Sequence, residues 1–148
     1  MARLEKNKIS VIIPVFNEAT GLSHFHKNLL AELSLITDIT PEIIYCNDGS
    51  TDNSADIIKR MSQNNHSVKL VSLSRNFGKE IAVTAGIHNA TGDALLMIDA
   101  DGQHPVELIP NFIQKWRDGS KVVVGVRTAN RGEGGVKKYG SKLFYYFI

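Results

Sequence analysis

Two acidic residues and an amide follow directly on a short apolar run at residues 94–103, which read ALLMIDADGQ. Asp99, Asp101 and Gln103 supply carboxylate and amide oxygens, the ligands that Mg²⁺ and similar divalent cations prefer. An apolar run of this length, bounded by polar turn residues, is typical of a strand buried on both faces of a parallel sheet. Ligands of open α/β sheets bind at the carboxyl ends of such strands. The segment therefore predicts a metal site. The alternative is that Asp101 caps the helix announced by Pro105.

Polar residues also follow three earlier apolar runs of the chain. They are Pro14, Phe16, Asn17 and Glu18 after the first run, Asn47, Asp48, Gly49 and Ser50 after the second, and Arg75, Asn76 and Gly78 after the third. Taken one at a time, residues 47–52 are ordinary turn and helix-cap chemistry, and Arg75 and Lys79 are solvated charges. Because the carboxyl ends of parallel strands meet at one edge of a sheet, we expect all four groups to converge there.

Strand and helix signals alternate along the chain, which favours an α/β fold with a doubly wound, mostly parallel sheet. Strands are predicted at residues 9–15, 42–47, 68–73, 94–99 and 121–126. Helices are predicted at residues 21–35, around Ile57, Ile58 and Met61, at residues 79–89 and at residues 110–117. Gly86 is expected to permit close packing of the third helix.

The composition of the 148 residues indicates a single globular domain, with 43% hydrophobic and 22% charged residues. One cysteine, Cys46, excludes an internal disulfide, and its place in a predicted strand indicates a structural thiol. No apolar run approaches the about 20 residues that span a bilayer. The apolar start of the chain lacks the cleavage site of a signal peptide.

Four ordered motifs resemble the inverting family 2 glycosyltransferases with the GT-A fold. They are residues 12–18 (IIPVFNE), 47–54 (NDGSTDNS), 73–80 (LSRNFGKE) and 92–103 (GDALLMIDADGQ). Their order and spacing are most similar to the polyprenyl-phosphate sugar transferases, the dolichyl-phosphate mannose synthase and bactoprenol glucosyltransferase group. The resemblance implies a metal-dependent enzyme, using Mg²⁺ or Mn²⁺, that moves a hexose from a UDP- or GDP-sugar to undecaprenyl or dolichyl phosphate. It also implies a place at the cytoplasmic, inner face of the cell membrane.

The same resemblance assigns roles by position. The nucleotide-sugar-binding set is Pro14, Phe16, Glu18, Asp48, Asn76, Lys79 and Asp99, the metal ligands are Asp99, Asp101 and Gln103, and the catalytic set is Asp99, Asp101 and Arg127. An arginine and a divalent cation would stabilise the charge that develops on the leaving diphosphate. Because an acceptor phosphate is already anionic at pH 7, no strong general base is required and none is assigned. The chain departs from many relatives at Gly102 and at His104, which stands in place of an acid.

The basic charge of the chain is concentrated in its tail. Residues 127–148 hold five basic residues against one acidic residue, while the whole chain carries a net charge of +2. We expect a catalytic domain at residues 1–131 and, at residues 132–148, the start of a basic amphipathic juxtamembrane helix that binds an anionic membrane surface. The alternative is a terminal helix packed on its own domain. The resembling proteins continue past this point, so we expect a C-terminally truncated chain, and its activity by itself stays open.

Several function classes are excluded by missing motifs. The first strand is not followed by G-x-G-x-x-G, which argues against a dinucleotide-dependent oxidoreductase, and no G-x-x-x-x-G-K-[ST] marks a P-loop NTPase. A sugar nucleotidyltransferase should have a Gly-rich basic loop at that place. Two alternatives remain: a non-catalytic nucleotide-sugar-binding or regulatory module, and a family 2 transferase with a saccharide acceptor. No nucleic-acid partner is expected; the sugar, the nucleotide base and the oligomeric state stay open.

Overall fold

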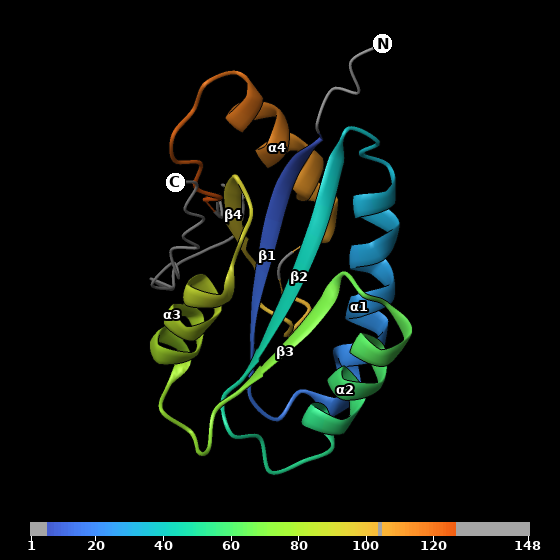
Figure 1. Ribbon diagram of the computed structural model, residues 1–148, viewed down its shortest axis with the longest axis vertical. Coiled ribbons are helices and arrows are strands. Elements are labelled where there is room, and N and C mark those ends of the chain that lie inside the picture. Colours follow the sequence, from blue (N-terminus) through green and yellow to red (C-terminus); the bar gives the residue numbers. More distant parts are fainter. Residues whose placement is uncertain (1–5, 104, 127–148) are drawn as a thin grey trace, which may run out of the picture.

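A four-stranded parallel sheet with helices on both faces forms the centre of the molecule (Figure 1). The computed structural model describes residues 6–103 and 105–126. Its strands are β1 (Asn7–Val15), β2 (Ile39–Asn47), β3 (Val68–Ser72) and β4 (Ala94–Met97). Its helices are α1 (Ala19–Ser34), α2 (Ser54–Asn64), α3 (Lys79–Asn89) and α4 (Ile109–Arg117), the last preceded by a single 3-10 turn, η1 (Val106–Leu108). No helix of the described residues is long and apolar enough to cross a membrane.

The strand order β3-β2-β1-β4 places the reversal of the winding at β1. The chain moves outward from β1 to β3 through α1 and α2, which pack on one face together with α4. It then crosses through α3, on the opposite face, to reach β4 beside β1. Figure 1 shows α3 on the other side of the sheet from α1 and α2. This arrangement confirms the predicted doubly wound sheet, and such a reversal is where open α/β sheets bind ligands.

Two apolar cores follow from the alternation of side chains along the strands. Ile9, Val11, Ile13 and Val15 of β1 face α1 in the larger core, whereas Ile12 belongs to a smaller core under α3. The close approach of α3 depends on Gly86, because a Cβ there would lie 2.6 Å from Ile12 Cγ2 and 2.5 Å from the Sγ of Cys46. Burial raises the pKa of the Cys46 thiol to about 12, as a structural thiol requires.

Two expectations about the sheet are wrong. The apolar run of β4 is not buried on both faces: Ala94 and Leu96 are buried, but Leu95 and Met97 are only half-buried. In the part of the chain that the structure describes, β4 is an edge strand, and the contacts of α3 with the sheet are to β1, β2 and β3. Residues 121–126 do not form a strand; Val122 makes an isolated bridge, and Val126 is 74% exposed. Strand propensity alone does not make these residues a strand, and within residues 6–103 and 105–126 the sheet consists of β1 to β4.

Glu42 is a buried carboxylate in β2 that ties the α3–β4 connection to the sheet. Its oxygens accept hydrogen bonds from Lys69 Nζ and Ser10 Oγ at 2.6 Å each, and from the backbone N–H and hydroxyl of Thr91 at 2.9 Å each. Burial alone would raise the pKa of Glu42, but the hydrogen bonds from Lys69, Ser10 and Thr91 together hold it well below its usual range. The ionised carboxylate therefore stabilises the folded chain.

Glu42→Gln is expected to lower the free energy of unfolding at pH 7 by about 2 kcal/mol, because a neutral amide loses the charge-assisted hydrogen bonds. The folded-state pKa is lower than the ordinary glutamate value of 4.5, so this contribution is present above pH 4.5 and is lost as the pH falls further. Urea unfolding at pH 7 and at acidic pH measures the difference between wild type and variant, which should shrink in acid. Glu80→Gln, at an exposed position of α3, should change stability by less than about 0.5 kcal/mol. A loss at Glu42→Gln that does not depend on pH would contradict the role of the ionised carboxylate.

Candidate functional site

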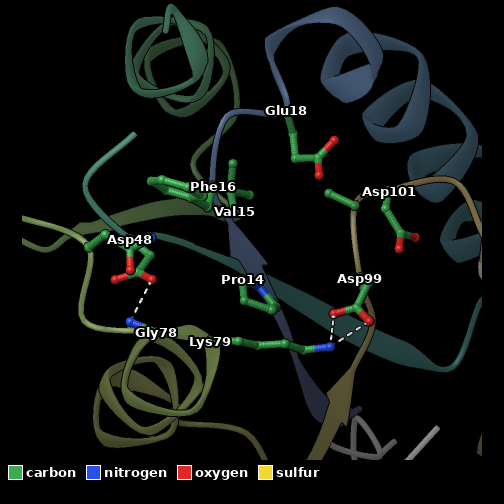
Figure 2. A pocket seen from close by; sticks show the side chains of 11 residues that line it. Pro14, Val15, Phe16, Glu18, Asp48, Gly78, Lys79, Asp99 and Asp101 are labelled. Carbon is green, nitrogen blue, oxygen red and sulfur yellow. Dashed lines mark hydrogen bonds and ion pairs between the residues drawn. The ribbon is translucent and has the colours of Figure 1, made fainter. Parts of the chain in front are cut away.

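All four strands end at one cavity of about 290 Å³, beside the reversal at β1 (Figure 2). Its lining residues are Pro14, Val15, Phe16 and Glu18 from β1 and its loop, Asp48 from the loop after β2, Asn76, Gly78 and Lys79 from the β3–α3 loop and the first residue of α3, and Asp99, Ala100 and Asp101 after β4. The expected convergence of the four polar groups on one edge of the sheet is confirmed.

The predicted site residues divide into three groups by position. All seven residues of the predicted nucleotide-sugar-binding set line the cavity, and so does Asp101. Gln103 is exposed and is not part of the lining; its backbone N–H donates to Asp101 Oδ1 at 2.9 Å. Arg127 and His104 lie outside the described residues. The structure therefore places most of the set together, and the role of each residue stays a prediction.

The loop after β1 is held by hydrogen bonds to the loop after β2. Asn17, with a positive φ of 55°, accepts through Oδ1 from the backbone N–H groups of Thr51 at 2.8 Å and Asp52 at 3.3 Å. The Ser54 hydroxyl accepts from the backbone N–H of Glu18 at 2.9 Å, so Glu18 is oriented by the start of α2. These contacts are not apparent from the sequence. The signal available was the density of turn-forming residues in NDGSTDNS, which indicates a loop but not its partner.

Asp48 holds the loop before α3. Its buried carboxylate accepts from the backbone N–H of Phe77 at 2.7 Å and of Gly78 at 2.9 Å, one on each oxygen. Next to it the two loops touch backbone to backbone, since a Cβ at Gly49 would lie 2.3 Å from the carbonyl carbon of Arg75. The Arg75 guanidinium, expected to be solvated, stacks over the Phe77 ring at 4.3 Å. Asp48 therefore shapes the cavity wall through this loop.

Lys79 at the start of α3 makes an ion pair across the cavity. Its Nζ lies 2.6 Å from each carboxylate oxygen of Asp99 (Figure 2). Lys79 keeps 54% of its side chain exposed while it makes this ion pair, so it is more than a solvated charge. This contact supplies positive charge beside the carboxylates that follow β4.

Carboxylates crowd the side of the cavity formed by β4 and the start of α1. Burial, and then repulsion from Asp101, Asp52 and Asp99, raise the pKa of Glu18 above its usual value. The position of Asp101 excludes the helix-cap alternative, because its Oδ1 closes a local turn at Gln103 while η1 and α4 begin further along the chain. The result is a concentration of negative charge that favours a bound cation.

The oxygen atoms that these side chains offer as metal ligands at this edge fit a divalent cation that binds together with a diphosphate. Asp99 and Asp101 offer hard oxygen ligands, and Gln103 an amide oxygen nearby in the chain. Within residues 6–103 and 105–126, no group of three or more His, Cys, Asp or Glu side chains is arranged to hold a metal ion. Mg²⁺ commonly binds through one or two carboxylates and completes its shell with substrate phosphates.

Comparison with known proteins finds that the chain is similar to sugar transferases. Residues 10–148 match the family model described as glycosyl transferase family 2. An uncharacterized glycosyltransferase of Synechocystis is 45% identical over 141 residues, which are 95% of this chain and 44% of that protein. A prophage bactoprenol glucosyl transferase homolog of Escherichia coli is 39% identical over 138 residues, 93% of this chain and 45% of that protein. The chain thus spans less than half the length of these curated relatives.

Two solved structures have a similar fold. A mannosyltransferase from Pyrobaculum calidifontis, in complex with GDP-Man and Mn²⁺, superposes with a TM-score of 0.64 at 23% identity, over 82% of this chain and 35% of that one. Staphylococcus aureus TarS 1–349 in complex with UDP gives a TM-score of 0.63 at 23% identity, over 88% of this chain and 38% of that one.

Proposed function

Because this chain belongs to glycosyl transferase family 2 and has the GT-A fold, we propose that it binds a nucleoside diphosphate hexose for transfer to a polyprenyl phosphate. One observation carries the proposal: the four strands end at a single cavity, where the Lys79–Asp99 ion pair and the Asp101 carboxylate lie beside Pro14, Phe16 and Glu18. Relatives named bactoprenol glucosyl transferase support a lipid-phosphate acceptor. The complexes of neighbouring folds with GDP-Man and with UDP support a nucleotide-sugar donor.

In this proposal the carboxylates after β4 and the lysine of α3 act on the diphosphate. Asp99, Asp101 and Gln103 would hold Mg²⁺ or Mn²⁺, which when bound neutralises charge on the leaving diphosphate. Lys79, which forms an ion pair with Asp99, would donate a hydrogen bond to a phosphate oxygen of the nucleotide sugar. Arg127 would bind the same phosphates. Both are basic side chains, and they would stabilise the nucleoside diphosphate as it leaves.

The transfer itself is a single displacement at the anomeric carbon, which inverts its configuration. An oxygen of the acceptor phosphate forms the new bond as the bond to the donor diphosphate breaks, and the electron pair leaves with the nucleoside diphosphate. Because the acceptor oxygen is already anionic, no side chain has to remove a proton from it. We place the reaction at the inner membrane face, with residues 1–131 as the catalytic domain and residues 132–148 at the lipid surface; that tail lies outside the described residues.

UDP or GDP is expected to bind this chain at least about tenfold more tightly with Mn²⁺ or Mg²⁺ than with EDTA, because Glu18, Asp99 and Asp101 repel an uncompensated diphosphate. Calorimetric titrations of both nucleotides, each with metal and with chelator, measure the difference. Equal affinities in the two conditions would contradict the metal role. An absence of nucleotide binding in both would contradict the proposed function.

The alternative expected from the sequence, a nucleotide-sugar-binding module without turnover, makes a different prediction. Donor binding and donor turnover, measured on the same polypeptide, separate the two. Adding polyprenyl phosphate in one reaction and an oligosaccharide in another separates a lipid-phosphate acceptor from a saccharide acceptor.

A further inference from the structure

The ion pair between Lys79 and Asp99 occupies both carboxylate oxygens of Asp99. Lys79 Nζ lies 2.6 Å from each of them, and Figure 2 shows the lysine side chain extended from the start of α3 toward Asp99. The Asp99 side chain is 17% exposed, and salt screens a partly buried pair less than an exposed one. In the proposed function Asp99 is also a metal ligand. The lysine ammonium group and a divalent cation therefore compete for the same oxygen atoms.

The charges around the cavity give Lys79 a second possible partner, the diphosphate of a nucleotide. Among the residues that the structure describes, Lys79 is the only basic one in the lining of the cavity. The other charged residues of the lining are all acidic: Glu18, Asp48, Asp99 and Asp101. Because these carboxylates repel a diphosphate, its oxygens are favoured next to the Lys79 ammonium group. One lysine thus serves two anions, the Asp99 carboxylate and the diphosphate.

The backbone at Lys79 is held in place, whereas its side chain can turn. The N–H of the preceding Gly78 donates to Asp48 at 2.9 Å, and the Gly78 carbonyl accepts from the N–H of Ala82 at 3.1 Å. These contacts hold the first turn of α3. The Lys79 side chain has a flexible aliphatic stem and is more than half exposed. Its ammonium group can therefore move from Asp99 to a phosphate oxygen without a change in the backbone.

We propose that Lys79 is a positioning residue, an internal counter-ion that keeps Asp99 from a divalent cation until a nucleoside diphosphate binds. When the diphosphate enters, Lys79 donates to a phosphate oxygen, and the Asp99 carboxylate becomes available as a metal ligand. The inference rests on the proposed function and adds to it a coupling between metal and nucleotide. Because such coupling is reciprocal, UDP should raise the affinity for Mn²⁺ by the same factor as Mn²⁺ raises the affinity for UDP.

The test measures Mn²⁺ binding in the absence of nucleotide, from the electron paramagnetic resonance signal of free Mn²⁺. Lys79→Met removes the ammonium group and keeps an unbranched side chain. We expect this variant to bind Mn²⁺ about tenfold more tightly than wild type, a factor within the usual range of coupling between sites. The factor by which UDP raises the Mn²⁺ affinity should fall correspondingly. Combined with Asp99→Asn, Lys79→Met should no longer tighten Mn²⁺ binding, because the effect acts through this pair.

Two further variants separate the ion pair from a general effect of charge. Lys59→Met, at an exposed position of α2 outside the cavity lining, removes the same charge and should change Mn²⁺ affinity less than twofold. Lys79→Arg keeps a positive group that can reach Asp99, so its Mn²⁺ affinity without nucleotide should stay near that of wild type. Urea unfolding curves of all variants, expected to superpose on that of wild type, exclude a general loss of structure.

Other outcomes overturn the inference and are distinct from a failure of the proposed function. If Lys79→Met binds Mn²⁺ no more tightly than wild type, Lys79 does not keep the cation from Asp99. If the tightening persists in full with Asp99→Asn, it does not act through Asp99. Both results come from titrations without nucleotide. The proposed function fails instead if wild type binds neither UDP nor GDP in the presence of Mn²⁺.

Discussion

Asp101→Asn is expected to slow hexose transfer by about 10²-fold or more while leaving the fold intact. Asp101 lines the cavity beyond the end of β4, and its carboxylate contributes to the repulsion that raises the pKa of Glu18. Asparagine keeps the size of the side chain and can still accept the hydrogen bond from the Gln103 N–H. It removes the negative charge, and with it an anionic oxygen ligand for Mg²⁺ or Mn²⁺.

Three measurements separate a metal role from a structural one. Transfer from UDP-glucose to polyprenyl phosphate is followed with the full-length protein, Mn²⁺-dependent UDP affinity by calorimetry, and Tm by thermal unfolding. Asp118→Asn, at an exposed aspartate after α4, is the control and should leave all three near wild type. Transfer by Asp101→Asn within a few-fold of wild type would refute the metal role. A large fall in Tm would instead make Asp101 a structural residue.

Gly49→Ala is expected to lower the free energy of unfolding by about 3 kcal/mol or more and to weaken nucleotide binding. Gly49 has a φ of +66°, which costs an L-residue about 1–2 kcal/mol. A Cβ there would also lie 2.3 Å from the backbone carbon of Arg75 and 2.6 Å from the backbone nitrogen of Asn76. Relieving this clash requires the loops after β2 and β3 to separate. Their separation breaks the hydrogen bonds from the backbone N–H groups of Phe77 and Gly78 to the Asp48 carboxylate, each worth about 1.5–3 kcal/mol.

Urea unfolding and UDP affinity with Mn²⁺ measure the two effects of Gly49→Ala. Gly21→Ala is the matched control for stability: a Cβ at this position of α1 meets nothing within 4 Å. In a helix, alanine is favoured over glycine by up to about 1 kcal/mol, so this variant should be as stable as wild type or slightly more so. Wild-type stability in Gly49→Ala would show that the two loops are not in fixed contact.

Local pattern was enough to predict the elements and the edge at which their polar ends meet. The prediction for α3 agrees with the structure at both ends, because an Ala-rich run between turn residues has few alternatives. The order of strand and helix signals implied parallel strands, and parallel strands bring Glu18, Asp48, Lys79 and Asp99 to one edge regardless of the contacts between them. The prediction of a strand at residues 121–126 is wrong. Local pattern reports the propensity of a segment to be extended, but not whether another strand pairs with it.

The sequence by itself therefore determined a doubly wound parallel α/β sheet and the edge of it at which acidic and other polar residues gather. Only the tertiary structure decided which contacts each polar residue makes there. The Asp48 carboxylate accepts hydrogen bonds from the backbone N–H groups of Phe77 and Gly78. Because every residue except proline has such a group, no residue type in the sequence indicates this contact. The Lys79–Asp99 pair joins residues 20 positions apart that meet because α3 crosses the sheet before β4.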